Sequence, residues 1–364
     1  MNRPALCSTL GSTLFAGAAL LPACGAAPRA SAPVHAGPSE PNPISAPGDH
    51  QAPPEPATTQ IVLSTEPWSF GSNPGLIIRT PNYRIYTTET SPTLRDRLPE
   101  FLERALAHYR TALGTLPGPT IRLDTYLMDT RPQWVALSKR LTGSNEGPHD
   151  LIGRGGYARR GIGVFYDIGL YDTLAIAAHE GWHQYTQRTF KDPLPMWLEE
   201  GIATYMEGHK WDGDRAVFQP WANIERFDRL RDAHARGALI PFPMLLESSP
   251  QELAKRHDGS ELTYYAQVWA LVHFLHEGEH NAYRAGLRSL LSDAAVGRVR
   301  VAMANKHGRS DAVRMLAERR GAELLSIYCG ADPATIGVGY DRFIDSIVRP
   351  GARNRITAGR SPLD

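Results

Sequence analysis

Residues 61 to 141 carry a pattern of hydrophobic and polar positions that predicts strands and helices in alternation. Two runs rich in β-branched and aromatic residues indicate strands, and a stripe of apolar side chains at helical spacing then runs from Leu94 to Leu113. The predicted strands are residues 75–80, 83–89 and 120–129, and the predicted helices are residues 91–113 and 131–141. This order of elements predicts a small mixed sheet with helices packed on it.

The pattern changes after this region. Residues 153–167, GRGGYARRGIGVFYD, are glycine-rich and then strand-like, which predicts a hairpin or a sheet edge, and their glycine spacing matches no nucleotide-binding loop. From Tyr171 onward the periodicity is almost entirely helical. Helices are expected at residues 172–189, 195–208, 221–236 and 261–277, with shorter ones up to Val348.

The expected fold class is therefore α+β. We expect an N-terminal α/β lobe over residues 61–170 and a mainly helical lobe over residues 171–348. Residues 349–364, RPGARNRITAGRSPLD, are polar and are expected to form a mobile tail.

The first 60 residues have the composition of an export signal followed by a tether. Residues 1–24 contain Arg3 and a short apolar run, too short to span a bilayer, and end in LPAC, which resembles a bacterial lipoprotein signal with Cys24 as the acylated residue. An ordinary cleaved signal ending near GAA is the alternative. Residues 25–60 hold nine prolines and almost nothing apolar to bury, so a disordered tether, or a linker needed only for translocation, is expected.

These features predict an exported protein, held on the cell envelope by an N-terminal lipid anchor or else secreted. The formal net charge of the chain is only +1. Such a balance gives no long-range attraction for polyanions, so nucleic acid is not expected as a partner.

The pentapeptide pattern His-Glu-x-x-His, which zinc peptidases carry on a helix, occurs twice, at residues 179–183 and 276–280. A working site needs the pattern inside a continuous helix, where residues four apart share one face, and it needs a third protein ligand. The first match lies within a long helical pattern with no proline until Pro193. The second lies where a helix is expected to end, at Gly278.

A second predicted helix separates the two matches further. Glu200 follows His183 by 17 residues, and Glu207 falls on the same helix face two turns later. One helix thus offers a third ligand and an outer carboxylate. No glutamate follows His280 until Glu318, and the second match is interpreted as chance.

Residues 172–208 resemble the gluzincin metallopeptidases, in which His-Glu-x-x-His is followed by a Glu immediately before Gly on the next helix. The stretches HEGWHQY and WLEEGIATYME carry this resemblance, which is greatest to bacterial secreted members. It implies a zincin-like helical lobe with the active site between the two lobes. It also implies one Zn²⁺ ion held by His179, His183 and Glu200, with Glu180 as general base and Glu207 supporting a ligand histidine.

Some assignments stay open at this stage. Glu199, about 100° round the helix from Glu200, is the rival third ligand, and Glu200 is favoured because it precedes Gly201 as the family pattern requires. Tyr265 resembles a tyrosine that gluzincins supply from a later helix to stabilise the oxyanion. Its neighbour Tyr264 is a rival, and an ordinary tyrosine at the edge of the core is the alternative.

The sequence departs from the aminopeptidase branch of that group. No Gly-x-Met-Glu-Asn segment precedes the first motif, so an endopeptidase acting on peptides or proteins is expected, with the strand around residues 161–165 pairing with the substrate backbone. The alternative function is a non-catalytic, zinc-binding envelope lipoprotein that acts as a binding or assembly module.

Overall fold

The computed structural model describes residues 61–143 and 155–363. The expected signal at residues 1–24, the acylated Cys24 and the tether at residues 25–60 lie outside the described residues. None of the helices in the described ranges has the length and apolar character needed to cross a membrane.

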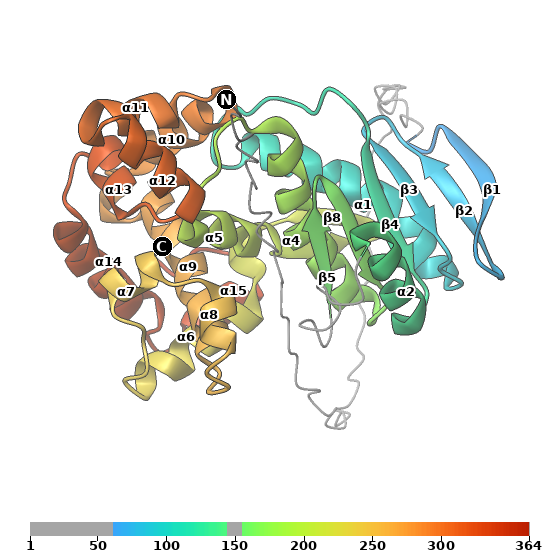
Figure 1. Cartoon of the computed structure of the whole chain (residues 1–364). Coiled ribbons are helices and arrows are strands. Elements are labelled where there is room, and N and C mark those ends of the chain that lie inside the picture. The colour runs from blue at the N-terminus through green and yellow to red at the C-terminus, as the bar shows by residue number, and fades with distance from the viewer. Residues whose placement is uncertain (1–60, 144–154, 364) are drawn as a thin grey trace, which may run out of the picture. The chain divides into compact units, whose positions relative to one another are not determined.

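The N-terminal part of the described chain is a mixed sheet of six strands in the order β1-β2-β3-β4-β6-β5 (Figure 1). The strands are β1 (Ser64–Phe70), β2 (Asn73–Arg79), β3 (Tyr83–Thr87), β4 (Leu123–Met128), β5 (Gly156–Arg159) and β6 (Ile162–Tyr166). Strands β3, β4 and β6 run parallel, whereas β1, β2 and β5 pair antiparallel with their neighbours. The predicted mixed sheet and the α+β class are confirmed.

Within the described residues, Gly156–Tyr166 of the glycine-rich segment form the hairpin that the sequence predicts, and residues 153 and 154 lie outside the described ranges. Arg160 and Gly161 connect β5 to β6, and both have positive φ angles, of 52° and 73°. Two such residues in a row form the tight turn that suits the twist of a hairpin. Because this hairpin ends the sheet, β5 is an edge strand and β6 is not.

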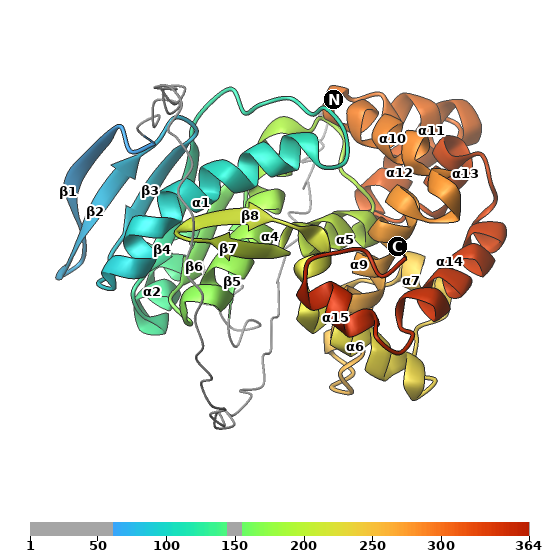
Figure 2. The same cartoon turned by 180° about the vertical axis from the view of Figure 1, so that it is seen from behind.

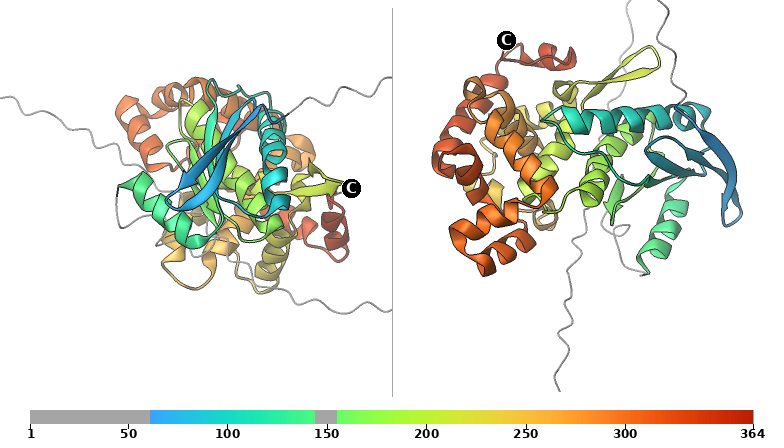
Figure 3. Two further views of the ribbon diagram at one scale, coloured as in Figure 1. Left: turned by 90° about the vertical axis from the view of Figure 1, so that its right-hand side faces the viewer. Right: turned by 90° about the horizontal axis from the view of Figure 1, so that it is seen from above.

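Helices cover both faces of the sheet (Figure 3). Helix α1 (Pro92–Thr111) packs on one face and α2 (Arg131–Thr142) on the other. The alternating burial along β3 and β4 turns Ile85, Leu123 and Leu127 towards α1. On the opposite face, the indole N–H of Trp134 in α2 donates to the carbonyl of Val164, at 3.2 Å.

The remainder of the chain is mainly helical, with one small hairpin that packs against α1 (Figure 2). The helices are α4 (Leu170–Thr189), α5 (Met196–Met206), α6 (Ile224–Ala235), α7 (Phe242–Glu247), α8 (Pro250–Ala254), α9 (Ser260–Glu277), α10 (Arg284–Val296), α11 (Val299–His307), α12 (Arg309–Glu318), α13 (Ala322–Cys329), α14 (Pro333–Ile347) and α15 (Ala352–Thr357). The hairpin strands are β7 (His209–Asp212) and β8 (Arg215–Phe218), and short 3-10 turns lie at Pro220–Ala222 and Glu279–Asn281.

The C-terminal segment differs from the expected mobile tail. Residues 352–357 form α15, in which Ala352 and Ile356 are buried. Arg353 pairs with Asp228 of α6 at 2.9 Å. The prediction was wrong here because the two apolar contacts and the ion pair depend on a helix more than a hundred residues earlier in the chain, which local polarity does not reveal.

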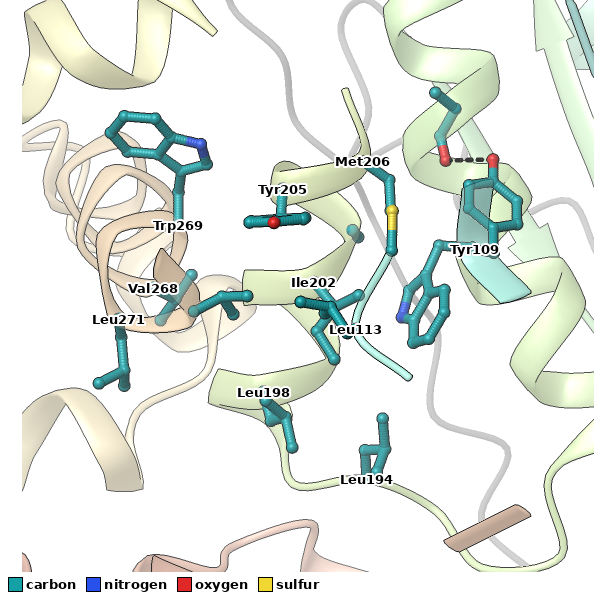
Figure 4. Packing of buried hydrophobic residues seen from close by; sticks show 14 of the residues in the cluster. Tyr109, Leu113, Leu194, Leu198, Ile202, Tyr205, Met206, Val268, Trp269 and Leu271 are labelled. Atoms are coloured by element: carbon teal, nitrogen blue, oxygen red, sulfur yellow. Dashed lines mark hydrogen bonds between the residues drawn. The ribbon is translucent and has the colours of Figure 1, made fainter. Parts of the chain in front are cut away.

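Helix α5 is the central element of the helical part, because it packs between α9 and the end of α1 (Figure 4). Ile202 of α5 lies between Val268 of α9 and Leu113, and all three are fully buried. The close approach of α5 to α9 occurs at Gly201. A Cβ at residue 201 would lie 2.7 Å from the carbonyl oxygen of Val268 and 2.9 Å from Cγ2 of Val272.

Gly201→Ala is therefore expected to destabilise the fold by about 1–3 kcal/mol, because backbone atoms of α9 would have to move. Chemical denaturation of the two proteins measures this difference. Gly118→Ala, in a loop, is the control for an added Cβ that would meet only the guanidinium group of Arg110, at 3.4–3.6 Å. Equal stability of the two variants would contradict the tight packing of α5 on α9.

Candidate metal centre

Helix α4 carries the first His-Glu-x-x-His match as an uninterrupted helix. His179, Glu180 and His183 lie in its middle, with 4 %, 1 % and 1 % of their surfaces exposed. Packing favours glycine at position 181, because a Cβ there would lie 2.5 Å from the hydroxyl oxygen of Tyr109. That hydroxyl donates to the carbonyl of Ala178 at 2.7 Å (Figure 4). The glycine thus lets α1 pack closely against the motif helix.

Helix α5 brings Glu200 to the two histidines. The Nε2 atoms of His179 and His183 lie 3.3 Å apart, and Oε2 of Glu200 lies 3.4 Å from the first and 3.5 Å from the second. A tetrahedral ion with bonds of about 2.0–2.1 Å has ligand atoms about 3.3–3.4 Å apart. The three atoms therefore form one face of a tetrahedron of the size that zinc requires, and the group could hold a metal ion.

Each histidine also contacts, through its Nδ1 atom, a glutamate that lies in α5 or directly after it. Nδ1 of His179 lies 2.8 Å from Oε1 of Glu207, and Nδ1 of His183 lies 3.1 Å from Oε1 of Glu199. A carboxylate accepts from Nδ1–H and so leaves the Nε2 lone pair directed at the ion. The expected contact of Glu207 is present.

Glu199, the rival third ligand, faces Nδ1 of His183 and not the two Nε2 atoms. Its Oε1 also accepts from the hydroxyl of Thr186, at 2.7 Å, and the group of three that could hold a metal contains Glu200 instead. The rotation of α5 about its axis decides between these two neighbours, and the sequence alone left that rotation open.

Two buried arginines neutralise the outer glutamates, and sequence reasoning missed both. Arg226 of α6 pairs with Glu207 at 2.9 Å, and Arg319, after α12, lies 3.6 Å from Oε2 of Glu199. Their exposed fractions are 4 % and 7 %. Buried arginine is rare unless it is paired, but its partner lies too far along the chain for any local motif to show.

In the metal-free cluster, interactions between the histidines and the glutamates outweigh burial and determine the direction of the pKa shifts. Burial disfavours charged imidazole, but hydrogen bonds with Glu200 and Glu207 outweigh it and raise the pKa of His179 to about 9. Burial likewise opposes protonation of His183, and the charge of Glu200 and the contact with Glu199 raise its pKa to about 10. Burial would raise the pKa of Glu200, but the two histidines outweigh it and lower that pKa.

Glu180 lies beside this triangle without belonging to it. Burial raises the pKa of its carboxyl group, and the neighbouring histidines offset this only in part. Its Oε2 has no hydrogen-bond partner within the described ranges. A buried carboxylate with a raised pKa and a free oxygen is suited to accept and return a proton.

Residues 161–165 were expected to pair with the substrate backbone, and this was wrong. The edge strand next to Glu180 is β5. Those residues lie in and before β6, which is paired on both sides, with β4 and with β5. The outer edge of β5 faces α4. At Ala158 the N–H contacts Glu180, and the carbonyl accepts from Gln187 at 3.2 Å.

Tyr265 of α9 lies close to the histidines, with its ring centre 6.0 Å from that of His179. The guanidinium of Arg226 lies over the same ring, at 5.2 Å from its centre. Burial raises the pKa of Tyr265 well above its usual value, so the phenol stays a protonated donor. The neighbouring Tyr264 is also fully buried and lies 6.0 Å from Tyr265 between ring centres.

The second His-Glu-x-x-His match forms no such site. Helix α9 ends at Glu277, and Glu279, His280 and Asn281 all have positive φ angles. His276 and His280 therefore do not share a helix face. Across the residues that the structure describes, the group of His179, His183 and Glu200 is the one set of three such side chains that could hold an ion.

Comparison with known families matches part of the chain. Residues 173–295 are similar to a family described as "Protein of unknown function (DUF1570)". The matched segment contains the three side chains of the triangle together with Glu180, Glu207, Arg226 and Tyr265. No curated protein matches the chain. The resemblance to gluzincin peptidases therefore rests on the motifs themselves.

Proposed function

We propose that the chain is a zinc-dependent peptidase that cleaves peptide bonds within its substrates. The observation that carries this proposal is the triangle of His179, His183 and Glu200, with atoms 3.3–3.5 Å apart and Glu180 buried beside it. Export, and attachment to the cell envelope through Cys24, are part of the proposal and rest on the sequence of residues 1–24.

The charges of the buried cluster favour a divalent ion. Glu180, Glu199, Glu200 and Glu207 carry four negative charges when ionised, and Arg226 and Arg319 carry two positive ones. The remaining charge of −2 is neutralised by one divalent cation when both imidazoles are neutral. Two histidines and one carboxylate are also a ligand set found in catalytic zinc sites, whereas magnesium and calcium prefer oxygen alone.

In this proposal the chain's residues divide the work of hydrolysis. A bound zinc ion would supply Lewis-acid polarisation of a water molecule and of the scissile carbonyl. Glu180 takes the proton of the attacking water and passes it to the leaving amine. The Tyr265 hydroxyl donates to the developing oxyanion. An extended substrate paired with the edge of β5 would lie beside Glu180 and would replace the contacts that Ala158 makes with Glu180 and Gln187.

The test of this function is hydrolysis of a mixed peptide library, followed by mass spectrometry of the products. We expect cleavage at internal bonds, abolished by a chelator and restored by zinc. Loss of single terminal residues would instead indicate an exopeptidase. A zinc-loaded protein that cleaves nothing would contradict the proposal.

One observation favours the alternative of a non-catalytic zinc-binding protein. His179, His183, Glu180 and Glu200 are each at most 4 % exposed, whereas a catalytic ion keeps a position open for water or substrate. The cobalt-substituted protein separates the two functions. A peptidase should change its visible spectrum when a hydroxamate inhibitor binds, and a closed structural site should not.

Metal binding is expected to release protons. The raised pKa values of about 9 and 10 mean that His179 and His183 carry protons near pH 7 in the metal-free protein, and these must leave before the nitrogens can bind an ion. Because two adjacent imidazolium groups repel each other, we expect about one to two protons released per ion. Apparent affinity should accordingly rise with pH up to about pH 10, where the second histidine loses its proton.

Titration calorimetry in two buffers of different ionisation enthalpy measures this release. A binding enthalpy that does not depend on the buffer would show that no proton leaves. That result would contradict the inference that the surrounding carboxylates keep the two histidines protonated in the metal-free protein.

A further inference from the structure

The guanidinium of Arg226 makes a bidentate contact with the carboxylate of Glu207, the glutamate that contacts Nδ1 of His179. Its Nη2 donates to Oε1 at 2.9 Å and its Nε donates to Oε2 at 3.1 Å. The planar guanidinium fixes both the position and the plane of a carboxylate bound in this way. Because Oε1 is also the atom that faces Nδ1 of His179, at 2.8 Å, the fork fixes the acceptor of the histidine.

The first turn of α6 supports the same carboxylate. Asn223, the N-cap residue of α6, donates to Oε2 of Glu207 at 2.7 Å and to the carbonyl of Thr204 at 3.0 Å. The amide of Arg226 in turn donates to the side chain of Asn223, at 3.3 Å. The start of α6 is thereby bound to the end of α5, and Arg226 has little freedom to move.

Arg226 also touches the proposed oxyanion donor. Its guanidinium carbon lies 5.2 Å from the centre of the Tyr265 ring, which is within the range of a cation–π contact. One side chain therefore contacts both the glutamate behind a metal-binding histidine and the tyrosine that faces the same histidine from α9.

We propose that Arg226 is a positioning residue, which sets the orientation of His179 through Glu207 and the place of Tyr265 through its ring. This inference rests on the proposed metal site and deepens it. Arg226 itself is not in the ligand triangle. Its effect on the metal must therefore pass through Glu207.

The test compares metal binding by the wild type, Arg226→Met and Arg231→Met. Arg231 is the matched control, because it is on the same helix, its ion pairs are with the half-buried Asp228 and the exposed Asp232, and it also lies over the ring of Phe227, away from the metal site. Competition with a chelator gives the dissociation constants for Zn²⁺ and Co²⁺, and the visible spectrum of the Co²⁺ form reports ligand geometry. Arg226→Met should bind about 10-fold to 100-fold more weakly, with a changed spectrum. Arg231→Met should match the wild type.

A double-mutant cycle with Glu207→Gln shows whether the effect passes through Glu207. In the Glu207→Gln background, Arg226→Met should cost little further affinity, since the carboxylate it orients is already gone. Equal losses in both backgrounds would overturn the inference. So would an Arg226→Met protein with wild-type affinity and an unchanged cobalt spectrum.

Separate controls distinguish loss of folding, loss of the positioning contact and failure of the proposed function. Removing Arg226 alone leaves the Glu207 carboxylate buried without its cation, a change that commonly costs several kcal/mol. If Arg226→Met does not fold, as judged by circular dichroism, Arg226→Lys decides the question, because it keeps the charge and loses the fork. It should bind more weakly than the wild type, and wild-type binding would overturn the inference. A wild type that binds neither metal would instead refute the proposed function itself.

Discussion

Glu180→Gln is expected to reduce peptide hydrolysis by about 10²-fold to 10⁴-fold while the protein keeps its metal. The amide has nearly the shape of the carboxylate but cannot accept the proton of the attacking water. Glu180 lies outside the ligand triangle, so the ion should stay bound. Turnover of a peptide identified from the library, measured together with metal content, gives both quantities.

The second motif supplies a control for this variant. Glu277→Gln makes the same substitution in the chance match, where the glutamate contacts His273 at 3.0 Å and lies away from the triangle. It should leave turnover near the wild-type value. Undiminished activity of Glu180→Gln would rule Glu180 out as the base, and loss of the ion together with activity would make it a ligand.

The neighbouring glutamates Glu199 and Glu200 are expected to differ sharply in their effect on metal binding. Glu200→Gln removes a ligand and should weaken binding by more than about 100-fold. Glu199→Gln removes the charge of the acceptor behind His183, at 3.1 Å, which also contacts Thr186 and Arg319, and outer contacts of this kind are worth about 10-fold to 100-fold. Chelator competition with each purified variant measures the two constants under the same conditions.

This pair needs no further control, because each variant is the reference for the other. Both substitutions keep size and burial and remove one charge. If Glu199→Gln weakened binding more than Glu200→Gln, the third ligand would be Glu199, and the orientation of α5 described above would be wrong.

The sheet could be predicted largely from the sequence because its central strands have strong local signals. Strands β3 and β4 alternate buried and half-buried residues, as their sequences indicate. Strand β1, with sequence STEPWSF, was not expected, since its polar residues and proline give no such signal. It pairs with β2 along its whole length, so pairing with a neighbour, rather than its own periodicity, accounts for it.

The core of the candidate site could be predicted for a similar reason. Helical spacing puts His179 and His183 on one face, and Glu200 and Glu207 on one face of the next helix. Spacing does not say how α5 is turned, so the contact of Glu199 with His183 was out of reach. Nor could Arg226 be assigned, because it comes from a third helix, 19 residues beyond Glu207.

Metal analysis of the purified protein tests the central claim most directly. We expect one zinc ion per chain by inductively coupled plasma mass spectrometry, after refilling with zinc and removal of free metal. The variant His179→Ala/His183→Ala, which loses two of the three ligand side chains, should hold none. A wild type without stoichiometric metal, or a double variant that keeps its zinc, would contradict the assignment of His179, His183 and Glu200 as a metal site.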